Sequence, residues 1–223
     1  MTRTKLSLRK LPGYTHGEEM FNMISHIAGA AFGVAALVIC LVISVAHQDV
    51  WAVVGSAVYG ASMILLYTAS SIYHGLPEGM AKKVMQVIDH CTVYLLIGGS
   101  YTPILLCTMR HRSPGWAWTL FGVVWGLALV AATFTAIDLK KYSKLSMACY
   151  IGMGWCIIIA IRPLIQAMPV AGIVWLVAGG VSYTIGAVLY GLGKKKRYMH
   201  SVFHLFVLAG SVMQFICIAR YVL

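Results

Sequence analysis

Long apolar segments joined by short polar links constrain the fold more than any other feature of this sequence. A transmembrane helix needs about 20 mainly apolar residues. The chain has seven such segments, at residues 22–46, 50–73, 84–108, 114–136, 145–161, 170–192 and 198–223. None of them shows the ten-residue alternation that is typical of a membrane β-barrel strand. The sequence therefore predicts an all-α membrane protein with a seven-transmembrane helix bundle.

The composition agrees with this interpretation. Only 10% of the residues are charged and 60% are hydrophobic, whereas a soluble domain carries about 25% charged residues. A chain of 223 residues holds seven helices and short loops, with no room for a separate soluble domain. We expect a basic tail over residues 1–21 and one membrane domain over residues 22–223.

The basic residues lie in short clusters between the apolar segments. Thirteen Lys and Arg residues fall on the side of the N-terminal tail and four on the other side. Because cytoplasmic loops carry an excess of Lys and Arg, the N-terminus is predicted to be cytoplasmic and the C-terminus outside. This distribution also explains the net charge of +11 without a nucleic-acid partner.

Two histidines, His200 and His204, lie four residues apart in the last apolar segment. Four residues make one helical turn plus about 40°, so both imidazoles leave the same face of the helix. Ionisable groups at membrane depth tend to face the protein interior or a cavity. The pair therefore suggests a shared partner, and a metal ion is the first candidate.

Other polar residues lie at a similar depth. His200 and His204 are roughly 3 to 9 Å from the cytoplasmic end of their helix, and Asp89 is roughly 7 to 8 Å into the third segment. His74 closes the second segment at the same membrane face, and Ser70 lies one turn deeper. Three helices thus place their polar groups in one layer.

This layer fits the chemistry of a zinc site. Three neutral imidazoles from His74, His200 and His204, with a fourth position open, form the ligand set of a catalytic site. Asp89 could hold a water molecule or orient a histidine, and Ser70 could hydrogen-bond beside His74. Zinc lowers the pKa of bound water to about 7, so the site could cleave a lipid amide or ester. The alternative is a hydrogen-bonded polar core without metal.

The remaining polar positions are less specific. His90 points about 100° away from Asp89 on a helix and is interpreted as structural. Asn22 and His26 are one turn apart in the first segment and either line the same cavity or pack. The pair at His200 is not a His-Glu-x-x-His motif, because residue 201 is Ser. All lysines are expected in the tail or loops, which excludes a retinal Schiff base.

Several motifs together resemble the hemolysin III family, the bacterial branch of the progestin and adipoQ receptor superfamily. The resemblance covers essentially the whole chain. The motifs are Glu18-Glu19 followed by Asn22 and His26, the segment Ser70 to His74, the segment Asp89 to Pro103, and His200-x-x-x-His204.

The resemblance implies a seven-helix bundle with a cytoplasmic N-terminus in the bacterial cytoplasmic (inner) membrane. It also implies zinc held by His74, His200 and His204, with Asp89 and Ser70 close by. Glu19, ahead of Glu18, matches the acidic residue of the first family motif. Glu19, Asn22, His26 and Tyr94 are candidates for lining the cavity.

The resemblance leaves three functions open. The metal site is similar to that of alkaline ceramidases, which implies hydrolysis of a lipid amide or ester in membrane homeostasis, with a membrane lipid or fatty-acyl ligand. The eukaryotic relatives are receptors, which implies a non-catalytic sensor with a structural zinc. A pore-forming cytolysin is the least favoured, because the polar groups gather at one depth and not along a path.

Overall fold

The computed structural model describes residues 4–192 and 196–223, and in this part of the chain every regular element is a helix. Seven helical stretches are long and apolar enough to cross a membrane, which confirms the predicted fold class. Their helices are α1 (His16–Ala46), α2 (Val50–Gly75), α3 (Met80–Pro103), α5 (Pro114–Ile137), α6 (Ser143–Trp155), α8 (Val170–Leu192) and α9 (Met199–Tyr221). The shorter elements are η1 (Leu6–Leu8), η2 (Ile104–Met109), α4 (Arg110–Arg112), η3 (Cys156–Ala160) and α7 (Ile161–Ala167).

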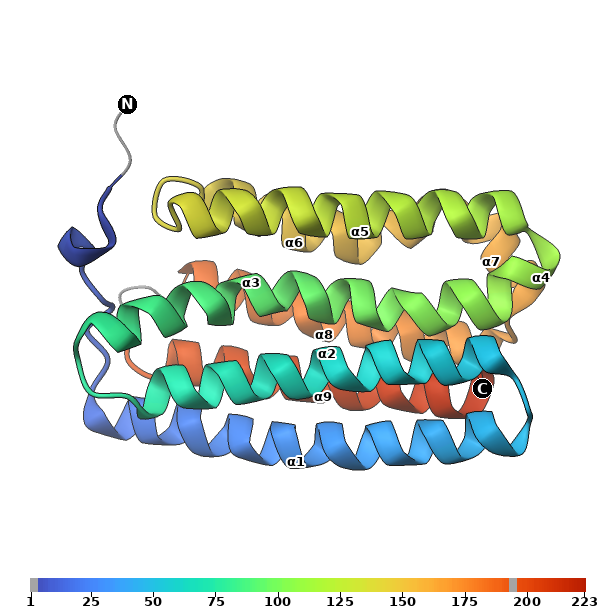
Figure 1. Cartoon of the computed structure of the whole chain (residues 1–223), viewed down its shortest axis with the longest axis horizontal. Helices are drawn as coiled ribbons and strands as arrows, with labels where there is room; N and C mark the ends of the chain where they lie inside the picture. The colour runs from blue at the N-terminus through green and yellow to red at the C-terminus, as the bar shows by residue number, and fades with distance from the viewer. Residues whose placement is uncertain (1–3, 193–195) are drawn as a thin grey trace.

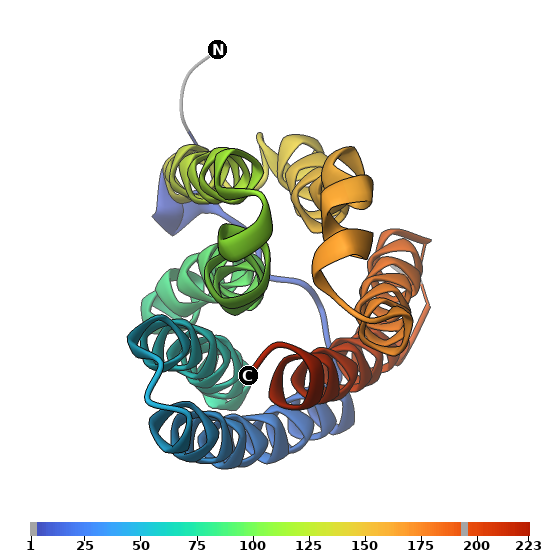
Figure 2. The ribbon, with the colours of Figure 1, turned by 90° about the vertical axis from the view of Figure 1, so that its right-hand side faces the viewer.

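The long helices form a ring in chain order (Figures 1 and 2). Each packs on the next, and α9 closes the ring against α1. The described N-terminal segment, which begins at Thr4, and the C-terminus lie at opposite ends of the bundle (Figure 1). The sidedness in the membrane stays a prediction, and three of the basic residues that support it, Arg3, Lys194 and Lys195, lie outside the described residues.

Small residues allow close contacts between neighbouring helices. A Cβ atom on Gly29 of α1 would lie 2.5 Å from the ring of Tyr67 on α2. Lipid gives little hydrophobic drive for helix association, so such close packing supplies much of the stability in a membrane bundle. Tyr67 is fully buried as a result and lies one turn before the polar layer.

Two helix starts differ from the sequence prediction. Helix α1 begins at His16 and not near residue 22, because Thr15 and Glu18 form a capping box in which each side chain accepts from the other's backbone N–H. Helix α3 begins at Met80. Lys82, expected in a loop, therefore lies in the first turn of α3 and is buried with 4% of its surface exposed.

Two of the spans change helical type part-way through. The third passes from α3 into the π-helical turn η2, and the fifth continues from α6 through the 3-10 turn η3 to Ala167, beyond the predicted end at residue 161. Tyr101 stabilises the change from α6 to η3 in the fifth span. Its hydroxyl donates to Gly154 O at 2.9 Å and accepts from Ile157 N at 3.1 Å. Unpaired backbone groups are costly at membrane depth, so this hydroxyl makes the irregular segment possible.

Candidate metal centre

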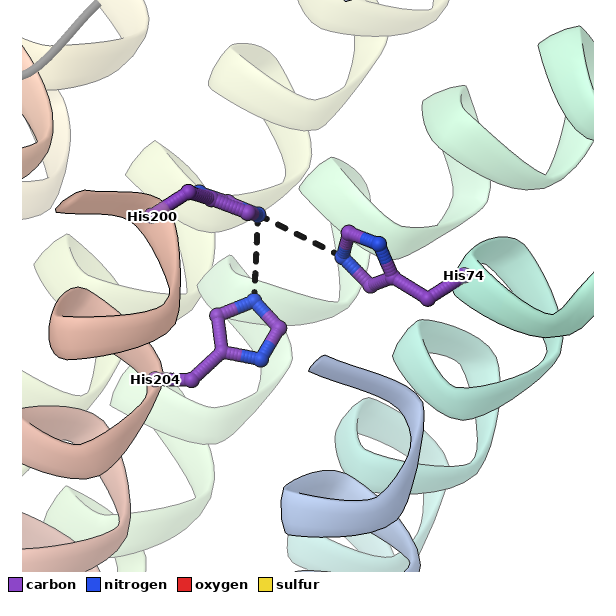
Figure 3. Close-up of side chains that lie close together, drawn as sticks. All are labelled: His74, His200 and His204. Atoms are coloured by element: carbon purple, nitrogen blue, oxygen red, sulfur yellow. Dashed lines mark hydrogen bonds between the residues drawn. The ribbon is translucent and has the colours of Figure 1, made fainter. Parts of the chain in front are cut away.

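His74, His200 and His204 form a cluster between α2 and α9 (Figure 3). His74 lies in the last turn of α2, and the other two lie in the first turns of α9. The Nε2 atom of His200 lies 3.3 Å from Nε2 of His74 and 3.1 Å from Nε2 of His204. One nitrogen from each ring lies within 4.8 Å of the other two, so this group can hold a metal ion.

The two short distances fit a tetrahedral ion. With Zn–N bonds of about 2.0 to 2.1 Å, ligand nitrogens lie about 3.3 Å apart along a tetrahedral edge. Hydrogen bonds alone explain the cluster less well, because His200 Nε2 carries at most one hydrogen and faces two ring nitrogens. A cation at the centre would satisfy all three lone pairs.

Glu19 and Lys82 orient His74. Oε2 of Glu19 lies 2.6 Å from His74 Nδ1, and Oε1 lies 2.9 Å from Lys82 Nζ. Because an ionised carboxylate can only accept, His74 Nδ1 donates and its Nε2 presents a lone pair to the cluster. This is the carboxylate–histidine arrangement that supports metal ligands in many proteins.

A cavity of about 190 Å³ extends from the cluster between α3, α6, α8 and α9. Most of its lining is apolar, and its histidines and its carboxylate are His26, Asp89, His90, His200 and His204. Ser70 also lines it. The fold thus brings Ser70 and Asp89, which sequence reasoning placed beside the histidines, to the same cavity as two of them.

Comparison with known proteins identifies the family. A family model described as "Haemolysin-III related" matches residues 14–215. The chain belongs to the haemolysin III family. It is 41% identical to Hemolysin-3 of Bacillus cereus over 206 residues, which cover 92% of each chain. It is 35% identical to the Hemolysin-3 homolog of Bacillus subtilis over 93% of this chain and 96% of the relative.

A more distant relative is the human Monocyte to macrophage differentiation factor, 22% identical over 181 residues, which cover 78% of this chain and 73% of that protein. The family match and the seven apolar helices together make this haemolysin III protein a multi-pass membrane protein.

His90 lines the cavity of this haemolysin III protein, although the sequence interpretation left it as structural. Its Nδ1 lies 2.8 Å from Gln86 O and 3.5 Å from Asp89 Oδ2. The backbone contact turns the ring back along α3 toward Asp89. A helical wheel gives only the direction of Cβ and cannot show this rotation.

Of the four other cavity candidates, His26 lines the cavity. Its ring stacks on His204 with centroids 3.7 Å apart. Neither ring nitrogen of His26 has a hydrogen-bond partner among the described residues. Glu19, Asn22 and Tyr94 are absent from the described cavity lining. Their polar groups instead contact His74, Ser201 and Thr135, respectively.

The N-terminal segment crosses one end of the ring (Figure 2), and Tyr14 of this segment packs against His74 and His200. Its ring stacks on His200 with centroids 4.9 Å apart and an interplanar angle of 9°. Burial raises the pKa of Tyr14 far above its ordinary value, so the phenol is neutral. Sequence reasoning assigned neither Tyr14 nor Lys82 a role at the metal centre, because each meets the site only through packing between distant segments.

Proposed function

We propose that this haemolysin III protein binds zinc through His74, His200 and His204 and hydrolyses an amide or ester bond of a membrane lipid. The observation that carries this proposal is the convergence of three imidazole nitrogens beside a largely apolar cavity that Asp89 and Ser70 also line. Imidazole ligands favour zinc and other first-row transition ions over calcium or magnesium.

When bound, zinc would act as a Lewis acid that polarises the scissile carbonyl and favours ionisation of water. In the proposed reaction Asp89 takes a proton from water as the water oxygen adds to the carbonyl carbon. Asp89 then returns the proton to the leaving nitrogen or oxygen as the C–N or C–O bond breaks. Ser70 positions the water, and the apolar walls hold the fatty-acyl chain.

We further infer that the protein acts in lipid homeostasis of the bacterial cytoplasmic (inner) membrane, with its N-terminus in the cytoplasm. The excess of basic residues at the N-terminal end of the bundle supports this orientation. The reactive bond of the lipid would then lie near the cytoplasmic leaflet.

A non-catalytic sensor with a structural zinc is the second candidate. One observation favours it: the centre joins α2 to α9 through the histidines, and joins α1 and α3 to α2 through Glu19 and Lys82. A metal there would brace four helices. A pore is not favoured, because most of the cavity lining is apolar.

Elemental analysis of detergent-purified protein tests the metal. Wild type and His200→Ala are prepared without added metal. We expect about one zinc per chain in wild type and loss of zinc in the variant. A well-folded wild type without metal would make the cluster a hydrogen-bonded core, and the hydrolase proposal would fail.

Incubation with lipid amides and esters then separates the two candidates. If the protein is a hydrolase, Asp89→Asn should keep its zinc and form no product. Product formation by Asp89→Asn would refute the role of Asp89. Absence of product from every wild-type reaction, with a lower melting temperature for His204→Ala, would favour the structural zinc.

A further inference from the structure

Residues 4–9 of the N-terminal segment dock on the start of α3 and the end of α5, whereas Tyr14 of the same segment contacts the histidines. Thr4 N donates to Asp138 Oδ2 at 2.9 Å, and Lys83 Nζ donates to Ser7 O at 2.6 Å. Arg9 makes a third contact, in which its Nη2 donates to Ile137 O at 3.0 Å. Figure 1 shows this segment beside the ends of α3 and α5.

Arg9 is buried but only partly paired. Its side chain is 6% exposed, and its other contacts are Thr4 O at 3.5 Å from Nη2 and Asp138 Oδ1 at 4.0 Å. Nε and Nη1, which carry three of the five N–H donors, have no partner among the described residues. Asp138 does not supply one, because its contact with Arg9, from Nη2 to Oδ1, is 4.0 Å long and exceeds hydrogen-bond distance. A buried donor without an acceptor is costly, so an acceptor from outside the described residues is expected.

Arg9 also lines a pocket of about 140 Å³. Apart from Arg9 its lining is entirely apolar in the described part of the chain: Leu6, Val84, Val87, Ile88 and Ala136. Val84 and Ile88 are 39% and 41% exposed on α3. They lie about 6 and 12 Å from the start of that helix, at the depth where a lipid headgroup meets its acyl chains. A ligand that fits both Arg9 and the apolar lining carries a negatively charged oxygen group next to an apolar part.

Basic residues in or next to α3 and α5 outnumber the carboxylate near Arg9, that of Asp138, and so favour an anion. Lys83 lies on α3, and Lys140, Lys141 and Lys144 follow α5. Arginine is well suited to phosphate because its planar guanidinium presents several donors and stays ionised. Basic residues at a membrane surface attract anionic lipids.

We propose that Arg9 and this pocket bind the phosphate of an anionic phospholipid from the leaflet at the basic end of the bundle. The acyl part of the lipid lies along Val84 and Ile88. No residue lines both this pocket and the cavity at the histidines, so the proposal is independent of zinc and of hydrolysis.

Native mass spectrometry of the full chain in detergent tests the site. Wild type, Arg9→Gln and Lys10→Gln are titrated with phosphatidylglycerol and with diacylglycerol of the same acyl chains. Lys10 is the matched control, since it is exposed beside Arg9. Loss of charge-assisted hydrogen bonds should weaken phosphatidylglycerol binding to Arg9→Gln about tenfold. Lys10→Gln should stay within about twofold of wild type, and diacylglycerol should bind weakly to all three.

Ala136→Trp provides a second variant that fills the pocket and keeps Arg9. It should lose phosphatidylglycerol binding as Arg9→Gln does, and both should keep wild-type zinc content. Undiminished binding to either variant, or equal binding of diacylglycerol, would overturn the proposal. Displacement of the lipid by inorganic phosphate at equal concentration would reassign the pocket to a free anion.

Discussion

The histidine centre and the Arg9 pocket lie at the same end of the bundle. The described residues supply partners for the polar groups that support the centre, but not for all the donors of Arg9. In the centre, Glu19 fixes His74 and Lys82 fixes Glu19, all from long helices. In the pocket, Arg9 of the tail caps the end of α5, and two of its three guanidinium nitrogens have no hydrogen-bond partner in the described part of the chain. We infer from this difference that the centre is preorganised for a small ion and that the pocket requires a larger ligand to supply acceptors.

Removing one ligand should break the centre most severely. His204→Ala leaves two imidazoles, which do not hold zinc, so zinc affinity should fall more than about 100-fold. Competition with a chromophoric chelator measures this change. His47→Ala is the control, because His47 is exposed and contacts Leu223 O. Similar zinc affinities in the two variants would refute the ligand role of His204.

Removing the carboxylate charge that orients His74 should give the second-largest loss of zinc affinity. Glu19→Gln keeps the side-chain shape but removes the charge that both His74 and Lys82 contact. Loss of such a partner lowers metal affinity about 10- to 100-fold. Glu78→Gln, at an exposed loop position, should match wild type in the same chelator assay. An unchanged affinity in Glu19→Gln would show that packing alone orients His74.

Lys82 acts one step further from the metal, so its effect should be smaller. Lys82→Met should weaken zinc binding about fivefold, because Glu19 then loses one partner but keeps His74. Lys83→Met is a matched control, since Lys83 bonds Ser7 O and not Glu19. Recovery of affinity in Lys82→Arg would support a charge contact over simple packing. If Lys83→Met weakened zinc binding equally, the effect would belong to the helix start as a whole.

Weakening the contacts of Asp138 that hold the N-terminal tail should give the smallest effect. Asp138→Asn removes a charged acceptor of two backbone N–H groups, which is worth about 1 kcal/mol, or about 2 to 4 °C in melting temperature for a chain of this size. Zinc content should not change. A large loss of zinc would show that the two sites are coupled through the tail.

The same substitution has a defined pH dependence. Burial raises the pKa of Asp138, but the N–H groups of Thr4 and Lys141 and the charge of Arg9 outweigh it, so the pKa lies below its usual range. A lowered folded pKa gives stability that is present above the unfolded pKa and is lost as pH falls through the folded pKa. The difference in melting temperature between wild type and Asp138→Asn should therefore be constant from about pH 6 to 8 and shrink below about pH 4. A difference that changes near neutral pH would point to another group.

Part of the candidate site could be predicted from the sequence because it depends on distances along one helix. The spacing of His200 and His204 fixes their common face, and their position near a helix end fixes their depth. His90 shows the limit of this reasoning: its backbone is placed correctly, but its side-chain rotation depends on Gln86 O and Asp89. Lys82 shows another limit, since a lysine after Gly79 has the features of a loop residue until its burial against Glu19 is known.

The seven membrane helices, most of their ends and a layer of polar residues at one depth all follow from the residue order alone. Helical periodicity and the thickness of the apolar layer are local properties, and the residue order specifies them. Only the tertiary structure decided which helices are neighbours and how each is rotated. That choice placed His74 against His200, Glu19 between His74 and Lys82, and Arg9 against Ile137 across 128 residues. Such contacts depend on side-chain packing across the whole ring, which no single segment contains.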